Sequence, residues 1–120
     1  MLFNFIVVGI GGFLGANARL IVTNWIKKKS NMKFPVATFI INVSGSFLLG
    51  LLIGMNISEA YLLLFGTGCL GAFTTFSTFQ LENKQLLTEK QKTVSICYFL
   101  SSYAFGLLFA FLGFQLGAIF

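Results

Sequence analysis

Long uncharged stretches alternate with short charged connections along the 120 residues of the chain. Charged side chains are absent from residues 1–18, 34–58, 60–81 and 93–120, and apolar residues 20–26 extend the first stretch. A helix that crosses a bilayer needs about 20 mostly apolar residues. The pattern therefore predicts an all-α membrane protein, a single domain with transmembrane helices at about 2–26, 34–55, 60–81 and 94–118.

The connections between these runs cover residues 27–33, 56–59 and 82–92, which leaves no room for a soluble domain. The runs do not alternate between apolar and polar residues, as the strands of a membrane β-barrel do. The first run also lacks the basic start and small-residue cleavage site of a signal peptide. We therefore expect it to remain as the first of four spans.

Composition narrows the chemistry further, because hydrophobic residues make up 57% of the chain and charged residues 9%. Histidine is absent, and the only acids are Glu59, Glu82 and Glu89. Most acid–base and nucleophilic catalysis needs such groups, so we expect no enzyme. The net charge of +5 comes from lysines beside the spans, which is typical of orientation signals, so we expect no nucleic-acid partner.

The basic residues all fall on one side of the predicted membrane. The first and third connections hold every lysine: Lys27, Lys28, Lys29, Lys33, Lys84, Lys90 and Lys92. Arg19 lies towards the same side, and the opposite side has no basic residue. Short basic connections stay in the cytoplasm under the positive-inside rule, so both termini are predicted outside.

Small residues recur at helical spacing in three of the spans. The stripes are Gly11/Gly15 and Gly12/Ala16, Ser46/Gly50/Gly54, Ser102/Gly106/Ala110 and Gly113/Gly117. Such spacing lets helix backbones approach closely in lipid. It predicts tight packing within the chain and between subunits, hence an oligomer. Cys69 and Cys97 lie inside spans without any ligand spacing and are interpreted as small apolar fillers.

Two polar residues inside the spans are candidates for function. The amide of Asn42 cannot be satisfied within its own helix, so it needs a partner or a pathway. Arg19 is either an interface anchor whose charge reaches the headgroups or part of a positive vestibule that attracts anions.

The third span, with GTGCLGAFTTFSTFQ at 66–80, makes a poor straight helix. Its GxGxxG spacing lacks the preceding strand of a dinucleotide site. Glycine, threonine and serine are weak helix formers, which predicts a central break, with a glycine kink as the alternative. A break would free carbonyls that suit a small cation. Phe73, Phe76 and Phe79 either face lipid or present ring edges to an anion.

These segments together resemble the Fluc (CrcB) family of bacterial fluoride channels. The matching motifs are GGFLGANAR at 11–19, Pro35 and Thr38 followed by NVSGSFLLG at 42–50, and GCLGAFTTFSTFQLE at 68–82. The TTFSTF core is long and specific. The chain departs from the family at Ala72, where many relatives have glycine, and the fourth span matches least.

The resemblance implies an antiparallel dimer with two separate fluoride pores and a structural sodium ion between the subunits. The implied pore residues are Asn42, Phe76, Phe79, Ser77, Thr78, Tyr98 and Ser102. The backbone carbonyls of Gly71 and Thr74 are the implied sodium ligands. The implied activity is passive export of fluoride across the bacterial plasma (inner) membrane. Because the basic residues fix one orientation, an antiparallel dimer predicts a related partner subunit of opposite orientation.

Two other classes of protein fit the size of the chain. A small four-helix multidrug-type exporter needs a carboxylate embedded in the membrane, whereas the three acids lie at span ends or in connections. A non-transporting assembly subunit fits the small-residue stripes, but it leaves the polar groups inside the spans without a purpose.

Overall fold

The computed structural model describes residues 1–29 and 34–120, so Lys33 lies outside the described residues. These parts of the chain are helical and contain no strand. In chain order the helices are α1 (Leu2–Lys29), α2 (Val36–Gly54), α3 (Glu59–Tyr61), the wider π-helix η1 (Leu62–Leu70), α4 (Gly71–Phe73), α5 (Ser77–Thr88) and α6 (Lys92–Ile119).

Four helical stretches are long and apolar enough to cross a membrane: Leu2–Lys29, Val36–Gly54, Glu59–Thr88 and Lys92–Ile119. The molecule is 47 Å long, which exceeds the hydrocarbon core of about 30 Å. The prediction of four helices long and apolar enough to cross a membrane is therefore confirmed. The chain's one proline, Pro35, stands immediately before α2, where its missing N–H costs no helical hydrogen bond.

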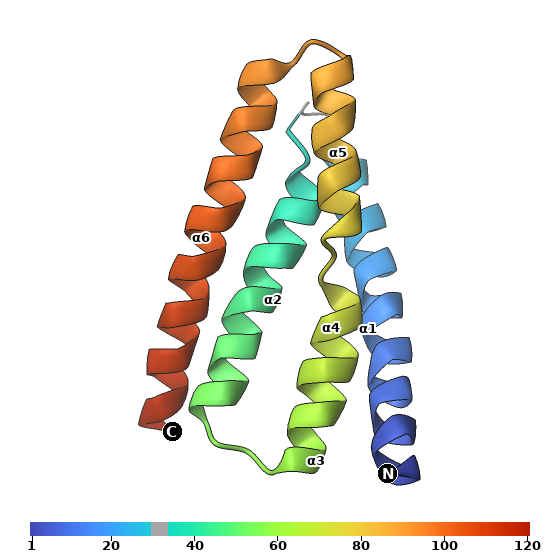
Figure 1. The fold of residues 1–120 in the computed structure, drawn as a ribbon, viewed down its shortest axis with the longest axis vertical. Helices are drawn as coiled ribbons and strands as arrows, with labels where there is room; N and C mark the ends of the chain where they lie inside the picture. Colours follow the sequence, from blue (N-terminus) through green and yellow to red (C-terminus); the bar gives the residue numbers. More distant parts are fainter. Residues whose placement is uncertain (30–33) are drawn as a thin grey trace.

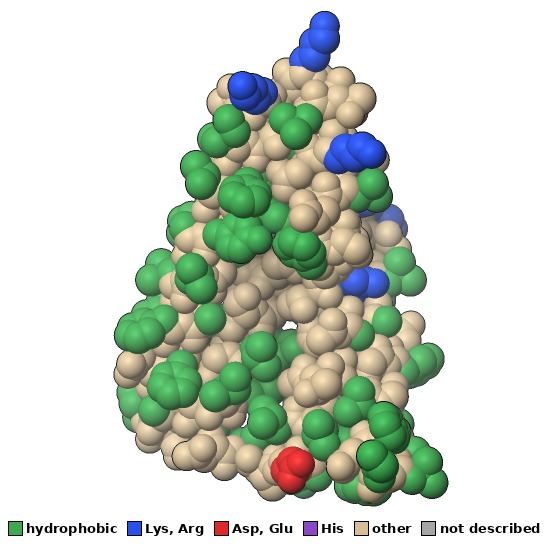
Figure 2. Space-filling model, viewed as in Figure 1, with side chains coloured by type: hydrophobic (Ala, Val, Ile, Leu, Met, Phe, Trp, Pro, Cys, Tyr) green, Lys and Arg blue, Asp and Glu red, His purple; other side chains and the backbone are tan. Residues whose placement is uncertain are grey.

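The spans pack mainly as two pairs, α2 against α6 and α1 against η1 and α4 (Figure 1). Both termini and the α2–α3 connection lie at one end of the molecule. The α5–α6 connection lies at the other end, and on the face shown in Figure 2 the basic side chains lie between that end and about mid-height. The structure thus places the termini opposite the lysine-bearing end, as predicted.

Glycines form the contact between α2 and α6. A side chain at Gly50 would meet the Ala110 carbonyl, and one at Gly113 would meet the Phe47 carbonyl. In the other pair, Gly15 touches the backbone of Cys69. Close helix packing through small residues is therefore confirmed inside the chain. The stripe containing Gly12 is different, because a side chain there would enter open space.

The third span is interrupted near its middle. Helix α4 ends at Phe73, and Thr74 takes an extended conformation with ψ of 158°. The next helix, α5, begins at Ser77. The predicted central break is confirmed, and the π-helix η1 leads into the short α4 that precedes it.

Beyond the break, α5 continues past the predicted end of the third span and reaches Thr88. Much of the stretch predicted as a connection is therefore helical. Asn83 and Leu86 are buried on this extension, and the Ser95 hydroxyl of α6 donates a hydrogen bond of 3.0 Å to Asn83 Oδ1. These contacts hold α5 against α6. The true connection turns at Lys90, whose φ of 62° is left-handed.

Candidate functional site: a groove at the break in the third span

Asn42 of α2 binds the broken segment through both ends of its side-chain amide. Its Nδ2 donates to the Thr75 carbonyl at 2.9 Å, and its Oδ1 accepts the Thr75 backbone N–H at 2.9 Å. The sequence prediction that Asn42 needs a partner is thus met by Thr75. An amide nitrogen carries two hydrogens, so the Thr75 contact leaves Nδ2 one further donor.

The Thr75 side chain makes a second set of bonds across the break. Its Oγ1 accepts the Thr78 backbone N–H at 3.2 Å and donates to Thr78 Oγ1 at 3.2 Å. Ser77 Oγ lies 3.3 Å from the same oxygen. The hydroxyls of Ser77 and Thr78 therefore support the start of α5.

Four successive carbonyls, those of residues 71–74, receive no hydrogen bond from the residues that the structure describes. Leu70, just before them, still accepts the Thr74 N–H at 2.9 Å. Such carbonyls are hard oxygen ligands of the kind that small cations prefer. The described residues contain no cluster of acidic, His or Cys side chains that could bind a metal. The donor set at Gly71 and Thr74 therefore fits a small cation.

Phe76 and Phe79 flank the start of α5 with ring centroids 6.0 Å apart. Phe76 is 59% exposed in the single chain, whereas Phe79 is buried. The Phe79 ring packs 4.9 Å from Tyr98 and meets Tyr103 edge-on at 6.0 Å. The two phenylalanines therefore differ: Phe79 belongs to the core of the chain and Phe76 lies on its surface.

A groove of about 670 Å³ runs beside the break. Of the predicted site residues, it is lined by Asn42, Gly71, Thr74, Phe76, Phe79 and Ser102. The Ser102 hydroxyl is buried without a hydrogen-bond partner among the described residues. A buried hydroxyl that has no protein partner marks a position where water or a ligand can bind. The structure thus brings the predicted anion and cation residues together in one groove.

The remaining predicted pore residues lie elsewhere. Ser77 and Thr78 contact Thr75, as described above, and are not among the groove-lining residues. Tyr98 is fully buried, and its hydroxyl donates to Glu82 Oε1 at 3.0 Å. Arg19 is partly exposed on α1 and lines neither the groove nor the second cavity described below.

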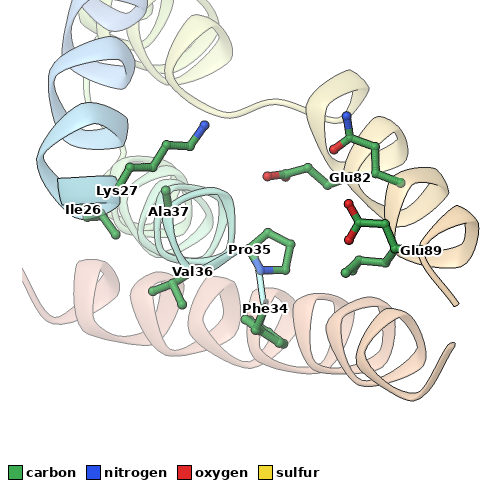
Figure 3. Close-up of a pocket in the computed structure, with 10 residues that line it drawn as sticks. Ile26, Lys27, Phe34, Pro35, Val36, Ala37, Glu82 and Glu89 are labelled. Atoms are coloured by element: carbon green, nitrogen blue, oxygen red, sulfur yellow. The ribbon is translucent and has the colours of Figure 1, made fainter. Parts of the chain in front are cut away.

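A second cavity, of about 280 Å³, opens at the lysine-bearing end (Figure 3). Lys27 reaches towards it from α1, and Glu82 extends from α5 on the other side. Phe34 and Pro35 line it from the residues just before α2. Glu82 therefore lies between this cavity and Tyr98, rather than in a solvated connection as the sequence suggested.

Two residues of this region, Thr75 and Glu82, were not predicted from the sequence. Thr75 was one of several threonines in the TTFSTF core, and nothing in the pattern distinguished it from its neighbours. Glu82 was assigned to a connection because the uncharged run ends there. The signal for Glu82 was its helical spacing from Phe79, since residues three positions apart share one helix face.

Comparisons with known proteins show the family of the chain. The model of the family described as CrcB-like protein, Camphor Resistance (CrcB), matches residues 6–114. A Bacillus cereus protein named "Fluoride-specific ion channel FluC 2" is 51% identical over 95% of this chain and 97% of its own length. "Fluoride-specific ion channel FluC 1" of Listeria monocytogenes is 44% identical over 98% and 99%. A Geobacillus kaustophilus protein of the same name is 44% identical over 92% of this chain and 94% of its own length.

The fold is that of a four-span membrane protein, and the relatives are named as ion channels. The chain belongs to the CrcB family, as the resemblance of its motifs indicated.

Proposed function

We propose that the chain is a subunit of a fluoride channel that lets the ion leave the cytoplasm passively. The observation that carries the proposal is the groove that Phe76, Phe79 and Asn42 line together with Ser102, whose hydroxyl is buried without a partner among the described residues. Its full-length relatives, at 44–51% identity, are named fluoride-specific ion channels. Export would lower cytoplasmic fluoride and so give resistance to it.

The residues of the groove suit a small, strongly hydrated anion. Conduction requires groups that replace the hydration shell and still release the ion. Ser102 Oγ and the second hydrogen of Asn42 Nδ2 are neutral donors, and aromatic ring edges carry partial positive charge. Described residues of the groove include no lysine or arginine, so no fixed cation would trap the anion there.

We further propose that two subunits pack antiparallel over this groove and enclose a structural sodium ion. The support is the open position of the groove, the exposed Phe76 ring, and the carbonyls of Gly71 and Thr74 beside it. A bound cation would be coordinated by these otherwise open carbonyl oxygens at the subunit interface. Each subunit pair would then hold two fluoride pathways.

The partner is proposed to be a related subunit of opposite orientation, with the termini of this chain outside the plasma membrane. The basic side chains gather at the end opposite the termini, so the chain carries a strong signal for one orientation. Fusing the C-terminus to reporters that are active only inside or only outside the cell tests this. We expect signal from the outside reporter alone, and equal signal from both would indicate dual topology and a homodimer.

Fluoride flux from liposomes tests the function directly. The chain is reconstituted in vesicles loaded with potassium fluoride, either alone or together with the related subunit from the same genome. Valinomycin is then added to make the vesicles permeable to potassium. A channel releases fluoride to an external electrode without a protonophore and without moving protons. Fluoride release that depends on proton exchange, or no release with either preparation, would contradict the proposal.

The multidrug-type exporter is tested in the same vesicles. Glu82 lies at the Tyr98 hydroxyl and lines the cavity at the lysine-bearing end, closer to the spans than the sequence suggested. An exporter would use such a carboxylate to exchange protons for a cationic drug. We expect Glu82→Gln vesicles and unmodified vesicles alike to show no drug-driven proton movement.

A further inference from the structure

The two carbonyls proposed to bind the cation, those of Gly71 and Thr74, each lose the backbone N–H that would bond to them in a helix. A side-chain oxygen accepts each of these N–H groups instead. In an uninterrupted α-helix, the Gly71 carbonyl would accept the Thr75 N–H, four residues on. The structure gives that N–H to Asn42 Oδ1 instead, at 2.9 Å. The Gly71 carbonyl therefore loses its partner to a side chain of another span.

The Thr74 carbonyl loses its donor in the same way. Its helical partner would be the Thr78 N–H, which the structure gives to Thr75 Oγ1 at 3.2 Å. Neither carbonyl receives another hydrogen bond within the described chain. Each diverted N–H remains satisfied, so the break leaves carbonyl acceptors open without leaving those two donors unpaired.

Asn42 also sets the direction of the Thr74 carbonyl. The chain has no cis peptide bond among its described residues, so the Thr74 C=O and the Thr75 N–H point in opposite directions across one planar peptide. Because the N–H points to Asn42 Oδ1, the carbonyl points away from Asn42. The second bond, from Asn42 Nδ2 to the Thr75 carbonyl, fixes the next peptide as well.

We propose that Thr75 and Asn42 are the positioning residues of the cation site: their oxygens withdraw the two N–H donors and so keep the Gly71 and Thr74 carbonyls open. This inference rests on the proposed sodium site. It gives Thr75 a role of its own, and it gives Asn42 a second role besides donating to the anion. Both residues act through the backbone and touch no cation themselves.

Sodium-dependent thermal stability tests the proposal without measuring fluoride transport. The reconstituted channel complex is titrated with sodium chloride against N-methylglucamine chloride, and the sodium concentration of half-maximal stabilisation is recorded. Thr75→Val keeps the branched shape but removes Oγ1, so the Thr78 N–H can return to the Thr74 carbonyl. We expect about a tenfold higher midpoint, equivalent to about 1.4 kcal/mol.

Matched variants distinguish the effect of losing the Thr75 hydroxyl from a general loss of stability. Thr75→Ser retains the acceptor and should keep the midpoint within about threefold of the unmodified protein, about 0.65 kcal/mol. Thr88→Val removes a hydroxyl that only donates to its own helix, at Lys84, and should leave the midpoint unchanged. A folded Thr75→Val protein with an unchanged midpoint, or equal losses in Thr75→Val and Thr75→Ser, would overturn the proposal.

If Thr75→Val does not fold, a second pair of variants, at Asn42, tests the positioning role. Asn42→Asp keeps an oxygen that accepts the Thr75 N–H, whereas Asn42→Leu does not. We expect Asn42→Asp to retain sodium stabilisation while losing fluoride flux, because it places a negative charge beside an anion path. Asn42→Leu should lose both. Equal sodium midpoints in the two variants would contradict the positioning role.

The same measurements distinguish this inference from the proposed function. Fluoride flux in the unmodified protein without any sodium effect would overturn the cation inference and leave the channel in place. Sodium stabilisation without fluoride flux would leave the inference standing and contradict the channel.

Discussion

The α2–α6 pair and the third span lie side by side, yet their backbones are satisfied in different ways. Each helix of the pair is continuous, and the two backbones touch where glycines such as Gly50 and Gly113 remove the side chain. The third span is interrupted, and side-chain oxygens of Asn42 and Thr75 accept two of its backbone N–H groups in place of its own carbonyls. Water cannot replace lost hydrogen bonds in lipid, so a helix that satisfies its own backbone is the stable arrangement there. The continuous α2–α6 pair can therefore serve as the scaffold of the chain.

This difference shows which parts of a small membrane protein can bind a ligand through the backbone. A continuous helix uses its own carbonyls internally, so it offers a ligand only side chains. The broken span offers carbonyls as well as side chains, and α2 holds it in place through Asn42. The continuous α2–α6 pair therefore supports the interrupted third span. The variants below test these two roles.

The largest effect is expected in the scaffold. Gly113→Leu places a side chain against the Phe47 carbonyl, so α2 and α6 must separate. Overpacking costs about 3 kcal/mol or more where backbone must move. We expect loss of monodisperse protein on size exclusion in detergent. Gly9→Ala, whose added methyl enters open space, is the control. Normal behaviour of Gly113→Leu would show that the pair is not rigid.

The next effect separates two phenylalanines of the groove. Phe76→Ile and Phe79→Ile should each lower fluoride flux about tenfold, since lost ring contacts of about 1.4 kcal/mol correspond to that factor. Thermal unfolding should distinguish them. Phe79 is buried against Tyr98, so its replacement should cost about 1–3 kcal/mol, whereas exposed Phe76 should cost less than about 0.5 kcal/mol. Near-normal flux in both variants would contradict the proposed role of the rings.

The last prediction concerns a pairwise coupling of about 1 kcal/mol in the extension that anchors the broken span. Asn83→Ala leaves the Ser95 hydroxyl buried without its partner and should destabilise the chain by about 1–3 kcal/mol. The double variant with Ser95→Ala should cost less than the sum of the single changes, by about 1 kcal/mol. Additive losses, measured as unfolding free energies in mixed micelles, would show that the two residues act independently.

Much of the fold was predictable because lipid imposes a simple rule on sequence. Uncharged runs of sufficient length identified the four spans, and the cluster of glycine, threonine and serine at 66–80 identified the break. The position of Glu82 was not predictable from charge alone. Its helix continues to Thr88 because Asn83 and Leu86 bury against neighbouring elements, and an uncharged-run criterion does not detect such contacts.

The candidate site was predicted as residues but not as contacts. Asn42 was recognised as needing a partner, whereas its partner Thr75 lies 33 positions away and looks like any other threonine in the motif. Ser102 was predicted beside the pore, but only the packed structure shows that its hydroxyl is buried and unpartnered within the described chain.

The number of helices long and apolar enough to span a membrane, the end that carries the lysines, the place of the break and membership of the family were all predictable from the sequence. These depend on local properties, such as hydropathy, charge, helix propensity and motif identity, which each segment carries alone. The packed structure was needed to show which backbone N–H groups bond to side chains and which carbonyls therefore stay open. It was also needed to show that Phe79 is buried and Phe76 is exposed. The first two outcomes depend on competition between the carbonyls of a helix and side-chain oxygens, one of them on α2 and the other on Thr75 of the third span itself. The competition from α2 arises only once that helix lies against the broken segment, because a hydrogen bond requires its two atoms to be within about 3 Å.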